Sequence, residues 1–267
     1  ADRFLTAVGC HVTKLYCEPN GIFPRVAEPS KEAVTQLCRS VKKSQADLGI
    51  ALDPDADRVA FVSEAGQYIG EEYSLALCAR YVLGHTPGTV VANMSTSRMI
   101  DDVAAEFGVK VLRTAVGEVN VADRVLDSGA IIGGEGNGGV IYPTIHPSRD
   151  SLTGMALMLQ YLLETGQTLT DLTREIPQYA MIKTKVDADR MAIIEFMKEL
   201  EKKAECDDVD LQDGVKLSWK DRWVHLRGSN TEPVLRIISE ARTAKEAKAL
   251  ADEYGARVAR HMTARKK

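Results

Sequence analysis

The 267-residue sequence predicts an α/β protein, with two α/β domains on parallel or mixed sheets, the first incomplete, followed by a small α+β domain. Three observations support this fold class. Strand-like apolar runs alternate with helix-like runs up to about residue 165, as in βαβ units. A glycine- and proline-containing break at 84–88 interrupts that series, which then begins again. From about residue 179 the order becomes strand, helix, two or three strands and helix, which is typical of an α+β domain.

The first predicted domain covers residues 1–85. Apolar runs predict strands, and amphipathic runs predict helices. We expect strands at 12–16, 48–52 and 59–62, and helices at 31–43 and 71–83. The run at 48–52 is continuously apolar, which indicates a buried strand.

The second predicted domain covers 86–178, with strands at 89–92, 109–112 and 130–132 and helices at 98–107 and 119–126. A further helix carries four apolar residues at helical spacing, which we expect to face the core. They are Leu152, Met155, Ala156 and Leu159.

The third predicted domain covers 179–267. Two strand-like runs at 215–217 and 223–226 flank Lys220-Asp221, which predicts a hairpin. The closing helix carries one apolar stripe that we expect to be buried. The stripe consists of Ala247, Leu250, Ala251, Tyr254 and Val258.

The composition is that of an ordinary globular protein, with 45% hydrophobic and 27% charged residues. A formal net charge of −4 creates no field that attracts nucleic acid. No stretch reaches the roughly 18 consecutive apolar residues of a membrane span. The five cysteines include no CxxC pair, so neither a disulfide framework nor a zinc site is indicated. We therefore expect a cytoplasmic protein with reduced thiols and with neither nucleic acid nor membrane as a partner.

Three aspartates directly follow the predicted strand at 48–52, in the segment Asp-Pro-Asp-Ala-Asp-Arg at 53–58. Three carboxylates so close together repel one another unless a cation neutralises them. An all-oxygen cluster suits magnesium or calcium rather than zinc. We therefore predict that Asp53, Asp55 and Asp57 bind a divalent cation. Magnesium is expected, because it usually completes its octahedron with phosphate oxygens or water, and a phosphate ligand is then implied.

Two other interpretations of this segment remain open. The aspartate spacing, with Glu64 at position twelve, matches an EF-hand calcium loop, but Arg58 stands at the sixth position, where that loop needs glycine. The residues after Arg58 also form a strand-like run. The other interpretation is an acidic, solvated turn between two strands, since aspartate is common in turns.

A glycine-rich segment, Gly-Gly-Glu-Gly-Asn-Gly-Gly at 133–139, follows a short apolar run. Such glycine density lets the backbone approach a ligand without Cβ clashes. Glu135 can accept hydrogen bonds from two sugar hydroxyls, and Asn137 can both donate and accept, so the segment suits a sugar. A flexible hairpin turn is the alternative. The dinucleotide fingerprint does not match, because Tyr142-Pro143 intervenes before any helix.

A third polar segment, Arg-Gly-Ser-Asn-Thr-Glu-Pro at 227–233, lies between two predicted strands. It offers a guanidinium, two hydroxyls, an amide and closely spaced backbone N–H groups, which are the parts of a phosphate clamp. A second charge comes from the next strand. The residues expected to bind phosphate are Arg227, Ser229, Asn230, Thr231 and Arg236. The alternative is a turn that caps both strands, with Arg227 solvated.

Together, these three segments resemble the α-D-phosphohexomutase superfamily, which includes phosphomannomutases, phosphoglucomutases and phosphoglucosamine mutases. The family's metal loop (DGDGDR or DPDADR), sugar loop (GExSG) and phosphate loop (RPSNTEP or RPSGTEP) correspond in order to residues 53–58, 134–138 and 227–233. The sequence departs from this pattern where Asn137 replaces serine, Gly139 replaces histidine and Gly228 replaces proline. From the resemblance, we expect the first two departures to alter sugar or phosphate contacts.

The resemblance implies an isomerase that interconverts hexose 1-phosphate and hexose 6-phosphate through a phosphoserine and a hexose 1,6-bisphosphate. It implies magnesium on the three aspartates, Arg58 as a catalytic residue near the transferring phosphoryl group, and Glu135 and Asn137 on the sugar. The expected partners are hexose phosphate and hexose bisphosphate, and the enzyme is expected to be a monomer or homodimer. The GEGNGG form of the sugar loop is similar to that of phosphoglucosamine mutases, which leaves glucosamine phosphate as an alternative substrate.

The family's phosphoserine motif, similar to TASHNP, does not occur in this sequence. Ala1 also enters at what resembles the end of the first helix of the family's second domain. We therefore expect a fragment of a longer enzyme that binds magnesium and phosphosugar without mutase turnover of its own.

A phosphatase of the haloacid-dehalogenase type is a further alternative, because a strand followed by Asp-x-Asp also opens that class. Its first aspartate acts as the nucleophile. That class expects threonine or valine soon after the second aspartate, where this sequence has Asp57 and Arg58.

Overall fold

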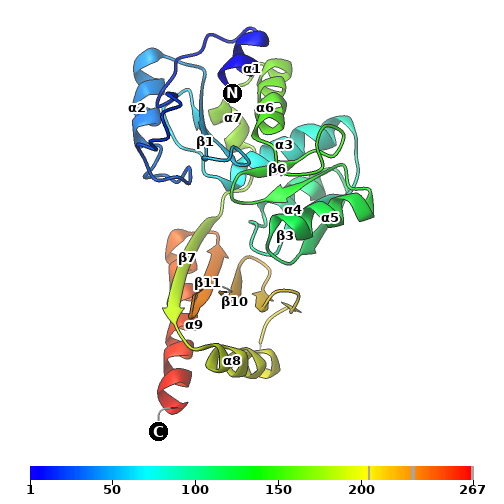
Figure 1. Cartoon of the computed structure of the whole chain (residues 1–267). Helices are drawn as coiled ribbons and strands as arrows, with labels where there is room; N and C mark the ends of the chain where they lie inside the picture. The colour runs from blue at the N-terminus through cyan, green and yellow to red at the C-terminus, as the bar shows by residue number, and fades with distance from the viewer. Residues whose placement is uncertain (204, 230–231, 266–267) are drawn as a thin grey trace. The chain divides into compact units, whose positions relative to one another are not determined.

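The computed structural model describes residues 1–203, 205–229 and 232–265, and Figure 1 shows the course of the chain. The chain forms two compact units. Residues 1–113 with 117–177 are called the N-terminal unit below, and residues 114–116 with 178–267 the C-terminal unit. The finer division at 1–85, 86–178 and 179–267 stays a prediction.

The first part of the chain alternates helices and strands, as the sequence predicts. Its elements are α1 (Asp2–Ala7), α2 (Thr35–Ser44), β1 (Leu48–Leu52), β2 (Val59–Ser63), α3 (Glu72–His85), β3 (Val90–Asn93), α4 (Met99–Glu106), β4 (Val111–Thr114), α5 (Glu118–Ser128), β5 (Ile132–Glu135), β6 (Gly139–Ile141), α6 (Ser151–Thr165) and α7 (Leu169–Arg174).

Two sheets organise the N-terminal unit. Strands β1 and β2 form an antiparallel hairpin, and a four-stranded sheet has the order β4-β3-β5-β6. Strands β3 and β5 are parallel and β5 and β6 antiparallel, so the predicted mixed sheet is confirmed. A Cβ added at Gly133 would meet Val125 of α5, whereas one at Gly134 would meet Leu75 of α3. Because consecutive strand residues face opposite sides, helices cover both faces of this sheet.

The C-terminal unit is an α+β structure. Its elements are β7 (Ala180–Asp187), α8 (Arg190–Lys203), β8 (Asp208–Asp210), β9 (Val215–Ser218), β10 (Trp223–Gly228), β11 (Val234–Ala241) and α9 (Ala244–Arg265). They form an antiparallel sheet of order β7-β11-β10-β9-β8, which includes four strands after α8 rather than two or three.

The core of the C-terminal unit lies between the sheet and its two helices. Leu226 and Ile237 of the sheet pack with Phe196 of α8 and Tyr254 of α9. The predicted stripe of α9 is confirmed, since all five of its apolar residues are buried. The predicted hairpin is confirmed as well, because β9 and β10 pair on either side of Lys220-Asp221.

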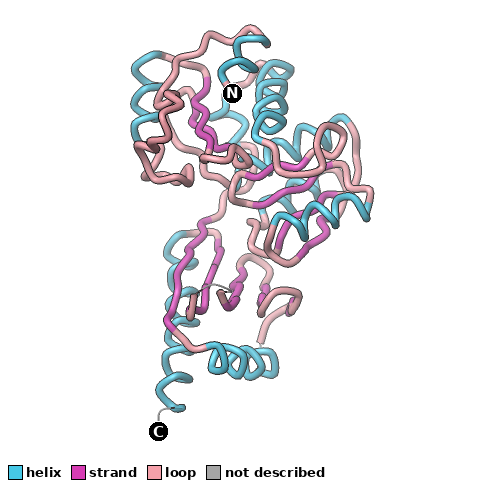
Figure 2. The backbone as a smooth tube through the Cα atoms, viewed as in Figure 1, coloured by secondary structure: helices cyan, strands magenta, loops and turns pink. Residues whose placement is uncertain are grey.

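Two predictions in the N-terminal unit were wrong. Residues 12–16 form no strand, and the whole stretch between α1 and α2 is irregular (Figure 2). These residues pair with no neighbouring strand, without which a strand's backbone groups stay unbonded. In α6, Met155 is buried as expected and Leu159 is half-buried, but Leu152 is 42% exposed, Ala156 is exposed and Met158 is buried instead. Because α6 is apolar on nearly every side, periodicity alone did not identify its buried face.

Within the described part of the chain, no helix combines the length and the apolar character needed to cross a membrane.

Candidate functional site

The three aspartates lie in the loop of the β1–β2 hairpin. Leu52 pairs with Val59, so residues 53–58 form the whole connection between the strands. The backbone N–H of Ala56 donates to the Asp53 carbonyl at 3.2 Å, and Ala56 adopts a left-handed conformation with φ 58°. Each aspartate offers one carboxylate oxygen within 4.8 Å of the other two. The strand β2 begins directly after Arg58, which excludes the EF-hand interpretation.

Arg58 folds back onto the first aspartate of this loop. Its Nε lies 2.5 Å from Asp53 Oδ2, and its backbone N–H donates to Asp53 Oδ1 at 3.1 Å. Its Nη1 pairs with Glu28 at 3.1 Å. Burial tends to raise the pKa of Asp53, but the hydrogen bonds from Arg58 outweigh it and lower that pKa. Asp53 is therefore an ionised, buried carboxylate.

Asp57 has a different environment in the same loop. Burial and the adjacent Asp53 carboxyl raise the pKa of Asp57 to about 6, and Arg149 acts against that rise. Its Oδ1 is buried and accepts no hydrogen bond within the described residues, although Arg58 Nε lies 3.6 Å away. A buried oxygen without a donor, among carboxylates that repel one another, fits a hard divalent cation.

The loop's other neighbours were not identified from the sequence. Arg25 donates through Nη2 to the carbonyl of Leu52, directly before Asp53, and through Nη1 to the carbonyl of Val26 at 2.8 Å. With Glu28 on Arg58, the segment 25–28 therefore contacts both ends of the aspartate loop. No residue pattern in that segment signals these contacts.

The glycine-rich segment forms the β5–β6 hairpin, which is tied to the aspartate loop. The backbone N–H of Val59, the first residue after that loop, donates to the Gly138 carbonyl at 3.0 Å. Gly138 has φ +96°, and a Cβ there would lie 2.6 Å from the Val59 carbonyl oxygen. The close approach of these two segments therefore requires glycine at this position.

Glu135 is buried and bound by three protein donors. Its Oε1 accepts from Asn93 Nδ2 at 2.6 Å and from the Gly117 backbone N–H at 3.1 Å, and its Oε2 accepts from Arg149 Nη1 at 2.7 Å. Asn137 is half-buried, and its Oδ1 accepts from the Gly139 N–H at 3.2 Å. Both residues lie in the hairpin that contacts the aspartate loop.

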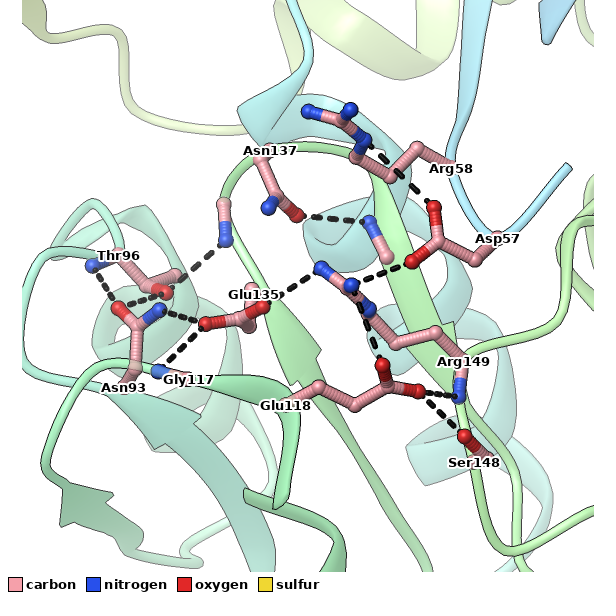
Figure 3. A network of polar contacts seen from close by, with 12 residues as sticks. Asp57, Arg58, Asn93, Thr96, Gly117, Glu118, Glu135, Asn137, Ser148 and Arg149 are labelled. Carbon is pink, nitrogen blue, oxygen red and sulfur yellow. Dashed lines mark hydrogen bonds and ion pairs between the residues drawn. The ribbon is translucent and has the colours of Figure 1, made fainter. Parts of the chain in front are cut away.

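Arg149 joins these two loops, and the sequence did not single it out. Its side chain, 14% exposed, pairs through Nη2 with Asp57 and with Glu118 and through Nη1 with Glu135 (Figure 3). Glu118 also accepts from the Ser148 hydroxyl. The only local signal is the position of Arg149 beside a helix start, which does not reveal its partners.

The predicted phosphate loop lies in the C-terminal unit. Arg227 pairs with Asp213 at 3.0 Å, and the Ser229 N–H donates to the Val234 carbonyl at 2.9 Å. Asn230 and Thr231 lie outside the described residues.

In the strand register, Arg227 of β10 lies directly opposite Arg236 of β11, and Arg236 lies directly opposite Lys185 of β7. Directly paired residues face the same side of a sheet, so three cations form a row across β10, β11 and β7. The sequence did not identify Lys185 as a candidate phosphate-binding residue, because only the strand register reveals that it lies opposite Arg236.

Comparison with known families gave three ordered matches. They are domain II of phosphoglucomutase/phosphomannomutase over residues 1–66, alpha/beta/alpha domain III over 71–179 and the C-terminal domain over 181–255.

Two curated relatives illustrate the similarity. A "Probable phosphoglucosamine mutase" of Methanopyrus kandleri is 41% identical over 254 residues, which are 94% of this chain and 56% of that protein. A "Phosphoglucomutase/phosphomannomutase" of Thermococcus kodakarensis is 39% identical over 248 residues, 91% of this chain and 54% of that protein. The chain thus spans about half the length of the curated relatives it matches.

Two solved structures share the fold. A phosphoglucomutase/phosphomannomutase family protein from Burkholderia thailandensis aligns with TM-score 0.85 at 23% identity, covering 98% of this chain and 57% of that one. The Aspergillus fumigatus N-acetylphosphoglucosamine mutase, solved with GlcNAc-6P and magnesium, aligns with TM-score 0.59 at 16% identity, covering 84% of this chain and 52% of that one.

Proposed function

Because the chain belongs to the phosphoglucomutase/phosphomannomutase family, we propose that it provides the metal-binding and phosphosugar-binding part of a phosphohexomutase. The whole enzyme would interconvert hexose 1-phosphate and hexose 6-phosphate through a phosphoserine and a hexose 1,6-bisphosphate. We retain the proposal that this chain alone has no mutase turnover. The three family matches at 1–66, 71–179 and 181–255 support a division into three domains.

The cluster of Asp53, Asp55 and Asp57 is the observation that carries this function. Each aspartate offers one hard carboxylate oxygen within 4.8 Å of the other two, and Asp57 Oδ1 is buried without a hydrogen-bond donor among the described residues. Such a set suits magnesium or calcium. Magnesium is proposed, and its presence in the fungal structural neighbour supports that choice.

The residues around the cluster have separate proposed roles. Arg58 is held by Asp53 and Glu28, so its positive charge is preorganised beside the aspartates. Magnesium, when bound, would neutralise charge on the transferring phosphoryl group. Glu135 and Asn137 would orient the sugar. Glu135 already accepts hydrogen bonds from three protein donors. It would therefore bind the sugar only through its remaining lone pairs and would otherwise shape the loop.

The cationic row of the C-terminal unit supports phosphate binding by Arg227, Ser229 and Arg236, with Lys185 as an addition. Asp213 beside Arg227 and Glu232 beside Lys185 offset part of the repulsion between these like charges, and a bound phosphate would offset more of it. Asn230 and Thr231 are proposed from the family resemblance alone.

The hexose itself is left open by the relatives, because the two curated proteins carry a phosphoglucosamine mutase name and a phosphoglucomutase/phosphomannomutase name. Hexose phosphates as a class are the proposed substrates. The phosphatase alternative is not favoured, since none of the matches described above is a phosphatase.

A magnesium titration tests the proposal. We expect the wild-type protein to bind magnesium in isothermal titration calorimetry and Asp55→Asn to lower its affinity by at least about tenfold. Asp55 is exposed, so this isosteric change should leave stability nearly unaffected.

Asp123→Asn is the matched control, because Asp123 is an exposed aspartate on α5 in the same unit. Its affinity for magnesium should equal that of the wild type. Equal losses in both variants would show that general surface charge, rather than the aspartate loop, attracts the cation.

Release of inorganic phosphate from glucose 1-phosphate would instead favour a phosphatase.

A further inference from the structure

Arg149 brings one guanidinium between three carboxylates that come from three parts of the N-terminal unit. Asp57 belongs to the β1–β2 loop, Glu118 is the first residue of α5, and Glu135 is the last residue of β5 (Figure 3). The ion pairs are Nη1 to Glu135 at 2.7 Å and Nη2 to Glu118 at 3.2 Å, together with Nη2 to Asp57. Only 14% of the Arg149 side chain is exposed, so these pairs are weakly screened by solvent.

The two carboxylate oxygens of Asp57 have different partners. Oδ2 accepts from Arg149, whereas Oδ1 is buried and has no hydrogen-bond donor among the described residues. The ion pair of Arg149 with Oδ2, together with the Arg58 Nε that lies 3.6 Å from Oδ1, restricts the orientation of this carboxylate. Asp57 contributes one carboxylate oxygen to the cluster formed with Asp53 and Asp55, and Oδ1 is the oxygen that Arg149 leaves available.

Arg149 is itself anchored on several sides. Its backbone N–H donates to Glu118 at 3.1 Å, and the next residue, Asp150, caps α6 by accepting from the backbone N–H groups of Leu152 and Thr153. A Cβ added at Gly139 would lie 2.1 Å from Arg149 Cδ, so the glycine hairpin leaves room for this side chain. An arginine held in this way loses little further conformational entropy when it orients a partner.

We propose that Arg149 is the positioning residue of the metal site, which holds Asp57 in the orientation that presents Oδ1 to a divalent cation and ties that orientation to Glu135 of the glycine hairpin. The inference rests on the proposed metal-binding function. Residues that orient metal ligands in this way typically alter affinity by about 10- to 100-fold when substituted.

The opposite role makes the opposite prediction. If Arg149 were a substitute counter-ion that the cation has to displace, its removal would strengthen cation binding, because the aspartates would lose a competitor. The sign of the change in magnesium affinity therefore decides between positioning and competition.

Arg149→Gln and Arg149→Lys are the test variants, and magnesium affinity by isothermal titration calorimetry is the measurement. We expect a loss of about 10- to 100-fold for the glutamine variant. The loss should be smaller for the lysine variant, which keeps the charge but lacks the fork that reaches Glu135 and Asp57 together. Arg149→Lys also keeps the test valid if Arg149→Gln does not fold, as judged by circular dichroism.

Arg80→Gln is the matched control. Arg80 is a 19% exposed arginine of the same unit that also pairs with two carboxylates, Glu106 and Glu175, and none of its ion pairs or hydrogen bonds among the described residues reaches the aspartate loop. Its magnesium affinity should equal that of the wild type. Unchanged or tighter binding in Arg149→Gln would overturn the positioning role, while failure of the wild type to bind magnesium would overturn the proposed function as well.

A double-mutant cycle separates positioning from a general structural effect. If Arg149 acts through Asp57, then adding Arg149→Gln to Asp57→Asn should change the remaining affinity by less than about twofold, because both substitutions then remove the same interaction. Manganese(II), followed by electron paramagnetic resonance, serves as the probe for such weak binding. An equal loss in both backgrounds would contradict action through Asp57.

Discussion

At the scale of single residues, Asp53 and Asp57 show how neighbours rather than residue type set the properties of a carboxylate. Both lie in one loop, yet Arg58 lowers the pKa of Asp53 against the effect of burial, whereas burial and Asp53 raise the pKa of Asp57 to about 6. The loop thus lowers the pKa of one carboxylate and raises the pKa of the other. A cation that neutralises the cluster would stabilise both in the ionised form.

Ala56 carries a conformational cost inside the same loop. Its φ of 58° lies in the left-handed region, which costs a residue with a Cβ about 1–2 kcal/mol. We expect Ala56→Gly to stabilise the hairpin by about 0.5–1 kcal/mol, because relief of that cost exceeds the entropy that glycine adds to the unfolded chain. Native-state hydrogen exchange of β1 and β2 measures the change.

Ala122→Gly is the comparison for that variant, since Ala122 lies within the α5 helix. There, glycine should destabilise the protein by about 1 kcal/mol. Destabilisation by Ala56→Gly of similar size would mean that the left-handed conformation is not a source of strain.

At the scale of elements, a backbone hydrogen bond joins the two hairpins that carry the proposed metal and sugar residues. It joins the N–H of Val59 in β2 to the carbonyl of Gly138 before β6. Val59 directly follows the aspartate loop and Gly138 lies in the same hairpin as Glu135, so this bond holds the two loops close together. Arg149 adds a side-chain connection between the same hairpins.

Gly138→Ala should break this junction. The new Cβ would lie 2.6 Å from the Val59 carbonyl oxygen at a position with φ +96°. We expect a loss of at least about 2 kcal/mol, which adds the clash to the cost of a left-handed alanine. Hydrogen exchange of the β2 and β6 amides is the measurement.

Gly129→Ala provides the matched control, because Gly129 is also left-handed, with φ +64°, but its added Cβ would meet nothing within 4 Å. Its cost should be about 1–2 kcal/mol. Equal costs for the two variants would show that the contact between the hairpins is not what requires glycine at position 138.

At the scale of the whole molecule, the chain divides into two units, and the C-terminal unit contains a hydrophobic core. The C-terminal core is formed by one sheet and two helices, and both tryptophans, Trp219 and Trp223, belong to this unit. Tryptophan fluorescence therefore reports on unfolding of the C-terminal unit. That unit also contains His225, which is fully buried and whose ring Nε2 lies 2.6 Å from the Asp213 carbonyl.

Acid should destabilise the C-terminal unit through His225. Burial lowers the pKa of His225 below its ordinary value of 6.5, although the hydrogen bond to Asp213 opposes this. Above pH 6.5 neither the folded nor the unfolded state binds the proton, so the contribution of His225 to the free energy of unfolding is fully present. As the pH falls below 6.5, the unfolded chain binds the proton first, and the free energy of unfolding decreases. The decrease ends when the pH reaches the lower pKa of the folded state. The slope is about 1.4 kcal/mol per pH unit.

Urea unfolding followed by tryptophan fluorescence tests this acid sensitivity between about pH 7.5 and about pH 5, a range on both sides of the ordinary histidine pKa. His225→Gln should remove the histidine part of the slope, whereas the same change at the exposed His11 should not. An unaltered slope in His225→Gln would mean that other groups cause the acid sensitivity.

The sequence by itself determined those features that depend on neighbours along the chain. The strand Leu48–Leu52, the aspartate loop after it and the buried stripe of α9 agree with expectation, because apolar period and turn-forming residues act locally. Three ordered loops also sufficed to indicate the family. The strand predicted at 12–16 was wrong, since a strand depends on a partner that local sequence does not specify.

Only the tertiary structure decided which distant residues join the aspartate loop in the N-terminal unit and the predicted phosphate loop in the C-terminal unit. Arg149 reaches Asp57, Glu118 and Glu135, and Lys185 joins Arg236 and Arg227 in one row, through strand register and helix packing. It also selected Met158 over Leu152 as the buried side of α6. Burial and charge pairing depend on which surfaces meet in space. A helix sequence that is apolar on all sides does not show which side is buried, and a charged residue does not show which distant residue will be its partner.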